Sequence, residues 1–168
     1  METEEIVEVE IDIVEFADRG EQPPNARGYR FRIDGDIHTA DIRHLTGEAI
    51  LGKAGKRPCA YELLQELTHR ENEVVDSNET VDLRRHGLRG FITAHKETVT
   101  IFVDDKPYPI VRGERTVDEI LGKVDETSEG FDLRQDIDGK LQLRPSNLHV
   151  SIKGCEAFFT QVKVGTTS

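Results

Sequence analysis

The chain has 168 residues, about a third of them charged, and a formal net charge of −11. This excess of acid argues against nucleic-acid binding, because neutralising phosphates requires clustered Lys and Arg. No apolar stretch approaches the roughly 20 residues that a membrane-spanning helix needs. Residues 1–5 are acidic where a secretory signal would be basic and then apolar. We therefore expect a cytoplasmic protein without nucleic-acid or membrane partners.

Residues 1–27 form an N-terminal arm. Apolar residues alternate with acidic ones in its first half: these apolar residues are Val7, Val9, Ile11 and Ile13. A two-residue period is typical of a strand with one buried face. The arm ends in a linker that contains Pro23-Pro24. The candidate strand is expected to extend the sheet of its own chain or, alternatively, the sheet of a neighbouring chain.

An internal repeat follows the arm. Ile50-Leu-Gly-Lys53 recurs as Ile120-Leu-Gly-Lys123, a displacement of 70 residues. The same displacement pairs Tyr61-Glu-Leu63 with Phe131-Asp-Leu133, and a displacement of 67 pairs Gly87-x-x-x-Phe91 with Gly154-x-x-x-Phe158. Collinear matches in which apolar residues meet apolar residues indicate a duplication. We expect one domain at 28–97, a second at 98–165, and a tail at 166–168.

Each copy begins with a strand in which apolar and polar residues alternate. The apolar positions are Tyr29, Phe31 and Ile33 in the first copy, and Val99, Ile101 and Val103 in the second. Asp34-Gly35 predicts a type I′ hairpin turn, and Asp104-Asp105 occupies the same place in the second copy. A second strand follows each turn, over 37–40 and 108–111.

A short helix comes next in both copies. Thr116-Val-Asp-Glu119 predicts a capping box, whereas Thr46 keeps only the cap. Further strands open at Tyr61 and Phe131, and Asp138-Gly139 predicts another tight turn. The final strands run over 80–93 and 148–164, interrupted by Gly87 and Gly154. This order predicts an α+β fold of two tandem β-grasp domains, each a mixed sheet with one short helix.

These motifs resemble the bacterial multiubiquitin domain, a tandem ubiquitin-like family. The resemblance rests on the Asp-Gly hairpin, the repeated Ile-Leu-Gly-Lys, the aromatic-acid-Leu strands and the closing Gly-x-x-x-Phe. It implies a non-catalytic modifier or substrate in a bacterial ubiquitination-like system. Its partners would be activating-, conjugating- and deconjugating-enzyme-like proteins. Some relatives of this type assemble with calcium.

A modifier needs a flexible tail that ends in glycine. The sequence closes with Gln161-Val-Lys-Val-Gly165 and then Thr166-Thr-Ser168. Conjugation would therefore require removal of the residues that follow Gly165 and would pass through its carboxylate; the alternative is that conjugation does not occur. Gly165 is the candidate conjugation residue.

Carboxylates gather at the predicted hairpins, where several oxygens could converge on calcium. The candidates are Asp34, Asp36, Asp104, Asp105, Asp136 and Asp138. Turn chemistry explains the same residues, because Asp is favoured in turns whether or not a metal binds. No EF-hand loop is complete.

Motifs for catalysis are missing from the sequence: there is no P-loop, no nucleophile elbow and no H-E-x-x-H. Cys59 and Cys155 lie far apart, so two reduced thiols are expected. Two alternatives to a modifier follow. One is a self-assembling structural protein whose dimers or filaments use the arm and the acidic turns. The other is a protein-binding adaptor.

Overall fold

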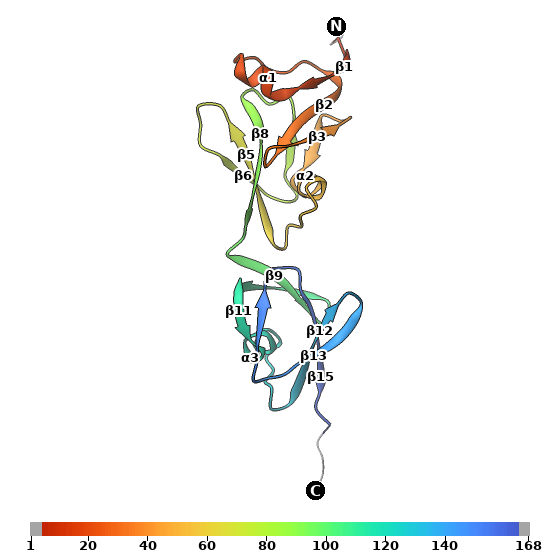
Figure 1. Cartoon of the computed structure of the whole chain (residues 1–168), viewed down its shortest axis with the longest axis vertical. Helices are drawn as coiled ribbons and strands as arrows, with labels where there is room; N and C mark the ends of the chain where they lie inside the picture. Colours follow the sequence, from red (N-terminus) through yellow and green to blue (C-terminus); the bar gives the residue numbers. More distant parts are fainter. Residues whose placement is uncertain (1–4, 165–168) are drawn as a thin grey trace. The chain divides into compact units, whose positions relative to one another are not determined.

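The computed structural model describes residues 5–164 (Figure 1). The chain divides into two compact units, unit 1 (Met1–His95) and unit 2 (Lys96–Ser168). The sequence places this boundary two residues later and treats the arm as separate from the first domain. In the structure the arm lies within unit 1.

Unit 1 is built around a mixed sheet. Its elements are β1 (Val7–Asp12), α1 (Ile13–Asp18), β2 (Ala26–Ile33), β3 (Asp36–Ala40), β4 (His44–Thr46), α2 (Gly47–Lys53), β5 (Tyr61–Leu67), β6 (Glu73–Val75), β7 (Thr80–Asp82) and β8 (Leu88–His95). The main sheet has the order β1-β2-β8-β5-β6, with β3 also paired to β2. Both β1 and β8 run parallel to β2. Strands β4 and β7 form a separate pair.

Unit 2 repeats most of this plan. Its elements are β9 (Thr98–Val103), β10 (Lys106–Val111), β11 (Gly113–Thr116), α3 (Val117–Leu121), a 3₁₀ turn η1 (Gly122–Val124), β12 (Phe131–Ile137), β13 (Lys140–Arg144), β14 (His149–Ile152) and β15 (Ala157–Val162). The sheet order is β10-β9-β15-β12-β13, and β11 pairs with β14. The expected mixed α+β architecture is confirmed.

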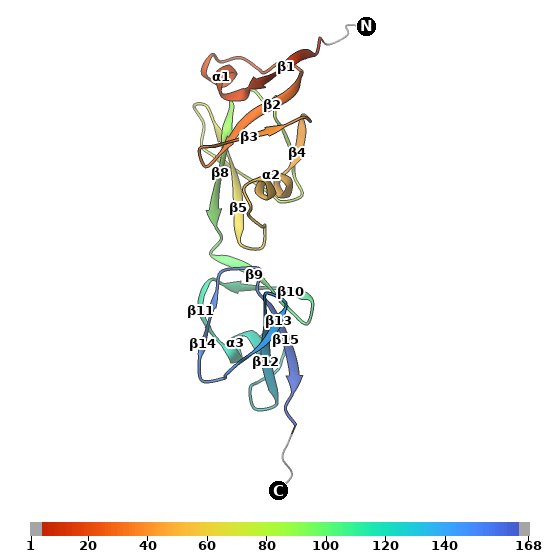
Figure 2. The ribbon, with the colours of Figure 1, turned by 45° about the vertical axis from the view of Figure 1, so that its right-hand side comes forward.

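The repeated apolar residues form the core of each unit. Ile50 of α2 and its counterpart Ile120 of α3 are both fully buried. Each packs in a cluster with the first and last strands of its own unit, and Figure 2 shows α2 and α3 each lying against the sheet of its own unit. Because each short helix covers one face of a sheet, the strands gain a dry side.

The hairpin turns have the predicted conformation. Asp34 and Gly35 have φ of 51° and 86°, Asp104 and Asp105 have 51° and 65°, and Asp138 and Gly139 have 54° and 83°. Two successive positive φ values define a type I′ turn, whose twist matches that of the flanking strands. The predicted caps are also confirmed. The Thr116 hydroxyl accepts from the Glu119 N–H in a complete capping box, and Thr46 caps α2 alone.

The arm differs from expectation because it contains a helix. Asp12 ends β1 and its carboxylate accepts from the Val14 N–H at 3.3 Å, which caps α1. Ile13 therefore begins the helix instead of continuing the strand. A register shift between Val7 and Glu10 leaves Val9 62% exposed, so the alternation does not place all four apolar residues on one face.

Two further sequence-level points can be compared with the fold. Among the described residues 5–164 neither Cys59 nor Cys155 is a free thiol, so the expectation of two reduced thiols is wrong. Separation along a chain does not determine whether a thiol finds a partner in the fold. Over residues 5–164, none of the helices is long and apolar enough to cross a membrane.

Candidate functional site

The arm is bound to its own unit by a ladder of ion pairs. Glu10 of β1 lies 2.9 Å from the Arg30 guanidinium of β2, and Asp12 accepts two hydrogen bonds of 3.2 Å from Arg32. The adjacent backbones pair in parallel. In the structure β1 therefore adds a strand to the sheet of its own unit. Acids alternate along β1 and arginines along β2 with the same period, and this pattern is a sequence signal that could have predicted the pairing.

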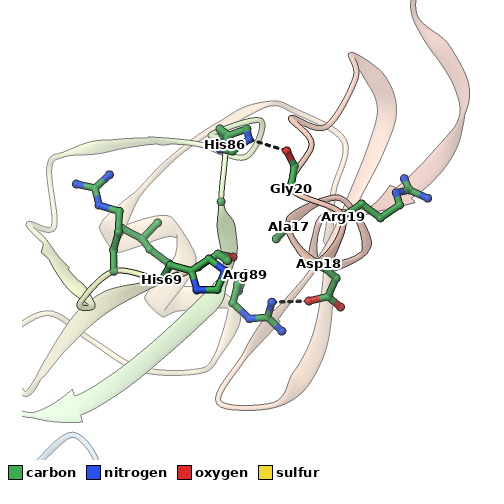
Figure 3. Close-up of a pocket in the computed structure, with 11 residues that line it drawn as sticks. Ala17, Asp18, Arg19, Gly20, His69, His86 and Arg89 are labelled. Carbon is green, nitrogen blue, oxygen red and sulfur yellow. Dashed lines mark hydrogen bonds and ion pairs between the residues drawn. The ribbon is translucent and has the colours of Figure 1, made fainter.

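A pocket of about 580 Å³ lies where the arm meets the rest of unit 1 (Figure 3). Its walls are the end of α1, the turn after β5 and the start of β8. The His86 ring donates to the Gly20 carbonyl oxygen at 2.9 Å, and Arg89 forms an ion pair with Asp18. Both contacts cross the pocket to the arm. The His86–Gly20 and Arg89–Asp18 contacts drawn in Figure 3 therefore hold the arm against the rest of unit 1. We assign the pocket a structural role.

The first acidic hairpin is held to the last strand of unit 1 by hydrogen bonds between Asp34 and Thr93. We call this pair of residues the aspartate clasp. Asp34 accepts hydrogen bonds from the Thr93 N–H at 2.8 Å and from the Thr93 hydroxyl at 2.5 Å. Lys56 donates to the Asp34 carboxylate at 3.0 Å and to the Thr93 hydroxyl at 2.6 Å, and its ammonium lies 5.0 Å from the Tyr61 ring centroid. The carboxylate therefore joins β8 to the hairpin between β2 and β3.

These contacts control the ionisation of Asp34. Partial burial opposes the charged form, but the hydrogen bonds from Thr93 and Lys56, with the Lys56 charge, outweigh it and hold the pKa of Asp34 below its ordinary value. A similar effect acts in the same unit, where the two hydrogen bonds from Arg43 hold the pKa of Asp82 low against the cost of burial.

Unit 2 contains the same clasp without the lysine. Asp104 accepts from the Thr160 N–H at 2.9 Å and from the Thr160 hydroxyl at 2.7 Å. The position equivalent to Lys56 is Glu126, and both residues donate their backbone N–H to an α-helical Leu carbonyl. Sequence reasoning missed Thr93 and Thr160 as partners, although the two threonines and the two aspartates occupy matching positions of the repeat.

The other candidate metal ligands do not gather at one place. Asp136 accepts from the Gly139 N–H at 2.8 Å, which stabilises its own turn. Asp36, Asp105 and Asp138 are exposed at hairpins. Over residues 5–164, no three His, Cys, Asp or Glu side chains lie where they could hold a metal ion together. Turn and clasp contacts account for Asp34, Asp104 and Asp136.

The last strand leads the chain out of unit 2. The Lys163 N–H donates to the Gly130 carbonyl oxygen at 2.9 Å, and its ammonium donates to the Ser128 carbonyl oxygen. Val164, the next residue, is 91% exposed. Gly165, the candidate conjugation residue, lies outside the described residues. The described chain therefore reaches solvent one residue before Gly165.

Comparison with known proteins identifies a family that part of the chain resembles. No curated protein and no solved structure matches the chain. A family model described as Multiubiquitin matches residues 29–96, which run from within β2 to Lys96, one residue beyond unit 1. The matched segment contains the Asp34 clasp and the Ile50-Leu-Gly-Lys53 helix. Residues 29–96 are therefore similar to the multiubiquitin domain, and the chain carries at least one ubiquitin-like segment.

Proposed function

We propose that the chain is a ubiquitin-like modifier of a bacterial ubiquitination-like system, made of two tandem β-grasp domains and acting in the cytoplasm without catalytic machinery of its own. The family match over residues 29–96 supports the first domain. The second is supported by the repeat, since both units place a hairpin, a capped short helix and a central parallel strand in the same order.

The observation that carries the proposal is the exit of the chain from β15. The backbone of Lys163 makes a hydrogen bond to the body of unit 2, and Val164 is almost fully exposed. A tail of this kind can extend into a narrow enzyme channel, where glycine presents a carboxylate without a side chain. The residue that corresponds to Gly165 after the first copy of the repeat is Thr98, which begins β9 of unit 2. Only the end of unit 2 therefore suits activation.

The partners would be a deconjugating peptidase, an activating enzyme and a conjugating enzyme. The peptidase would hydrolyse the bond between Gly165 and Thr166, and the activating enzyme would use ATP to form a thioester at the new carboxylate. Incubation with such a peptidase, followed by mass spectrometry, should show loss of the residues after Gly165. A chain that ends at Gly165 should then form an ATP-dependent thioester.

A matched pair of variants separates the glycine requirement from general damage to the tail. Gly165→Trp should abolish the thioester, because the side chain blocks the channel. Val164→Ala should retain it, since Val164 is exposed and makes no core contact. A chain that is not cleaved and forms no thioester would contradict the modifier proposal. A Gly165→Trp variant that forms the thioester normally would also contradict it.

The self-assembly alternative depended on the arm and the acidic turns. The arm pairs with β2 of its own chain, and Asp34 and Asp104 are engaged by Thr93 and Thr160. These contacts use the groups that assembly would need, so we favour the modifier over calcium-dependent dimers or filaments.

A further inference from the structure

The outer edge of β13 is open. This strand ends the order β10-β9-β15-β12-β13, and over residues 5–164 no other strand pairs with its outer side. Ile137 and Lys140 flank a two-residue turn, so they form a hydrogen-bonded pair, and such pairs alternate along an antiparallel ladder. The backbone groups of Leu141 and Leu143 consequently point away from β12. An edge of this kind can accept another strand.

An apolar surface lies beside this edge. Leu141 and Leu143 share one face of β13 and are 53% and 44% exposed. Leu143 and Phe159 lie on either side of Arg134 across the sheet. A shallow depression of about 530 Å³ on this face is lined by Arg134, Leu141 and Phe159 together with two polar residues of β15. The surface can therefore cover apolar side chains of a bound segment.

Cations flank the edge on its other face. Lys140 and Arg144 stand at the two ends of β13, on the side opposite the leucines. Arg144 donates to the Gln135 amide oxygen at 2.8 Å. Over residues 5–164, neither Lys140 nor Arg144 forms an ion pair with an acid. In a chain of net charge −11, they are available to carboxylates of a partner.

The equivalent edge strand of unit 1 is short and carries a charged side chain. This strand, β6, spans only Glu73–Val75. Glu73 forms ion pairs with Arg70 at 3.2 Å and with Arg85 at 2.8 Å. A short edge strand bearing a charge of its own discourages strand addition. The open edge is therefore a property of unit 2.

We propose that β13 is a strand-addition site for an extended segment of a partner protein in which apolar residues alternate with carboxylates. Successive side chains of such a segment point to opposite faces. Its apolar residues would cover Leu141 and Leu143, and its carboxylates would meet Lys140 and Arg144. The chain already uses this chemistry once, where the acidic strand β1 adds to the arginine-bearing β2. The site is independent of conjugation at Gly165.

A second copy of the chain fits this edge less well. Antiparallel pairing of two β13 strands centred on Gln142 would place Lys140 of one copy opposite Arg144 of the other. Like charges directly opposite each other destabilise a strand pair. The charge pattern therefore favours a partner with acids over a homodimer.

The probe is a synthetic peptide of about seven alternating Val and Glu residues, titrated into the full-length ¹⁵N-labelled chain. Amide shifts should concentrate at residues 140–144 and at Phe159. A control peptide with Lys in place of Glu should bind about tenfold more weakly, because it repels Lys140 and Arg144. Shifts confined to other strands, or equal binding of the two peptides, would overturn the proposal.

Three variants sharpen the test. Leu143→Glu should weaken binding of the peptide about fivefold. Val74 is the equivalent exposed position of unit 1, so Val74→Glu should leave binding unchanged. Leu143→Pro should also weaken binding, because it removes an outward N–H while sparing the ladder to β12. An unchanged affinity in Leu143→Glu would overturn the site. A Leu143-dependent dimer without peptide, seen by sedimentation, would identify a second copy as the occupant and also overturn it.

Discussion

Unit 1 and unit 2 each have a hydrophobic core, a capped helix and an aspartate clasp. They differ in the strands at the edges of their sheets. Unit 1 has the β1–α1 arm beside β2, a lysine in its clasp and a short, charged edge strand. Unit 2 has none of the three in its described part, and it has an open edge at β13 and an exposed Val164 after its last strand. The two units match in the residues that form the core, the helix cap and the clasp, and they differ at the edges of their sheets.

The largest expected difference between the units concerns the arm. Deleting residues 1–20 removes Ile13, which is fully buried in the unit 1 core, together with the acids that pair with β2. Losing a buried isoleucine alone costs about 3 kcal/mol. Hydrogen exchange read by mass spectrometry should therefore show faster exchange throughout unit 1 and unchanged exchange in unit 2.

Ile13→Ala in the intact chain is the matched control, because it should reproduce most of the loss while retaining β1. Val9→Ala should have little effect, since Val9 is mostly exposed. Equal exchange in the deleted and intact chains would mean that the arm adds nothing to unit 1.

The two aspartate clasps should differ by a smaller amount in their contribution to the free energy of unfolding. Asp34→Asn removes the charge that binds Lys56, and hydrogen bonds to charged groups are worth about 2 kcal/mol. Asp104→Asn should cost less, roughly 1 kcal/mol, because the new amide can still donate to the Thr160 hydroxyl. Denaturant unfolding followed by unit-specific amide signals measures both changes. Equal losses would indicate that Lys56 contributes nothing to the first clasp.

The same pair of variants has a pH dependence. The pKa of Asp34 is lowered in the folded state, so its contribution is fully present above the unfolded pKa and is lost as pH falls through the folded value. The stability gap between the wild-type chain and Asp34→Asn should therefore narrow below about pH 4. A gap that stays constant into acid would show that the charge of Asp34 is not what stabilises the hairpin.

The smallest expected difference lies in the helix caps. Thr116→Ala should cost about 1 kcal/mol, because it breaks both hydrogen bonds of the capping box of α3. Thr46→Ala should cost about 0.5 kcal/mol, because α2 has the cap without the reciprocal bond. Thermal unfolding of the two variants compares them directly. A larger loss from Thr46→Ala would reverse this order.

The sequence by itself determined the local features of this protein. Apolar alternation, the Asp34-Gly35 turn and the Thr116 cap depend on residues within a few positions of one another, so they can be read along the chain. The repeat aligned Ile50 with Ile120, and the structure shows both fully buried between helix and sheet.

Only the tertiary structure decided which distant residues meet. It placed β1 on β2, joined Asp34 to Thr93 and Asp104 to Thr160, and began α1 at Ile13, where the period suggested more strand. The strand pairing and the two clasps depend on which distant segments lie side by side in the folded chain, which local periodicity does not encode. Two of the candidate calcium ligands, Asp34 and Asp104, hold their hairpins through the N–H and hydroxyl groups of Thr93 and Thr160, which lie about 56 to 59 positions further along the chain.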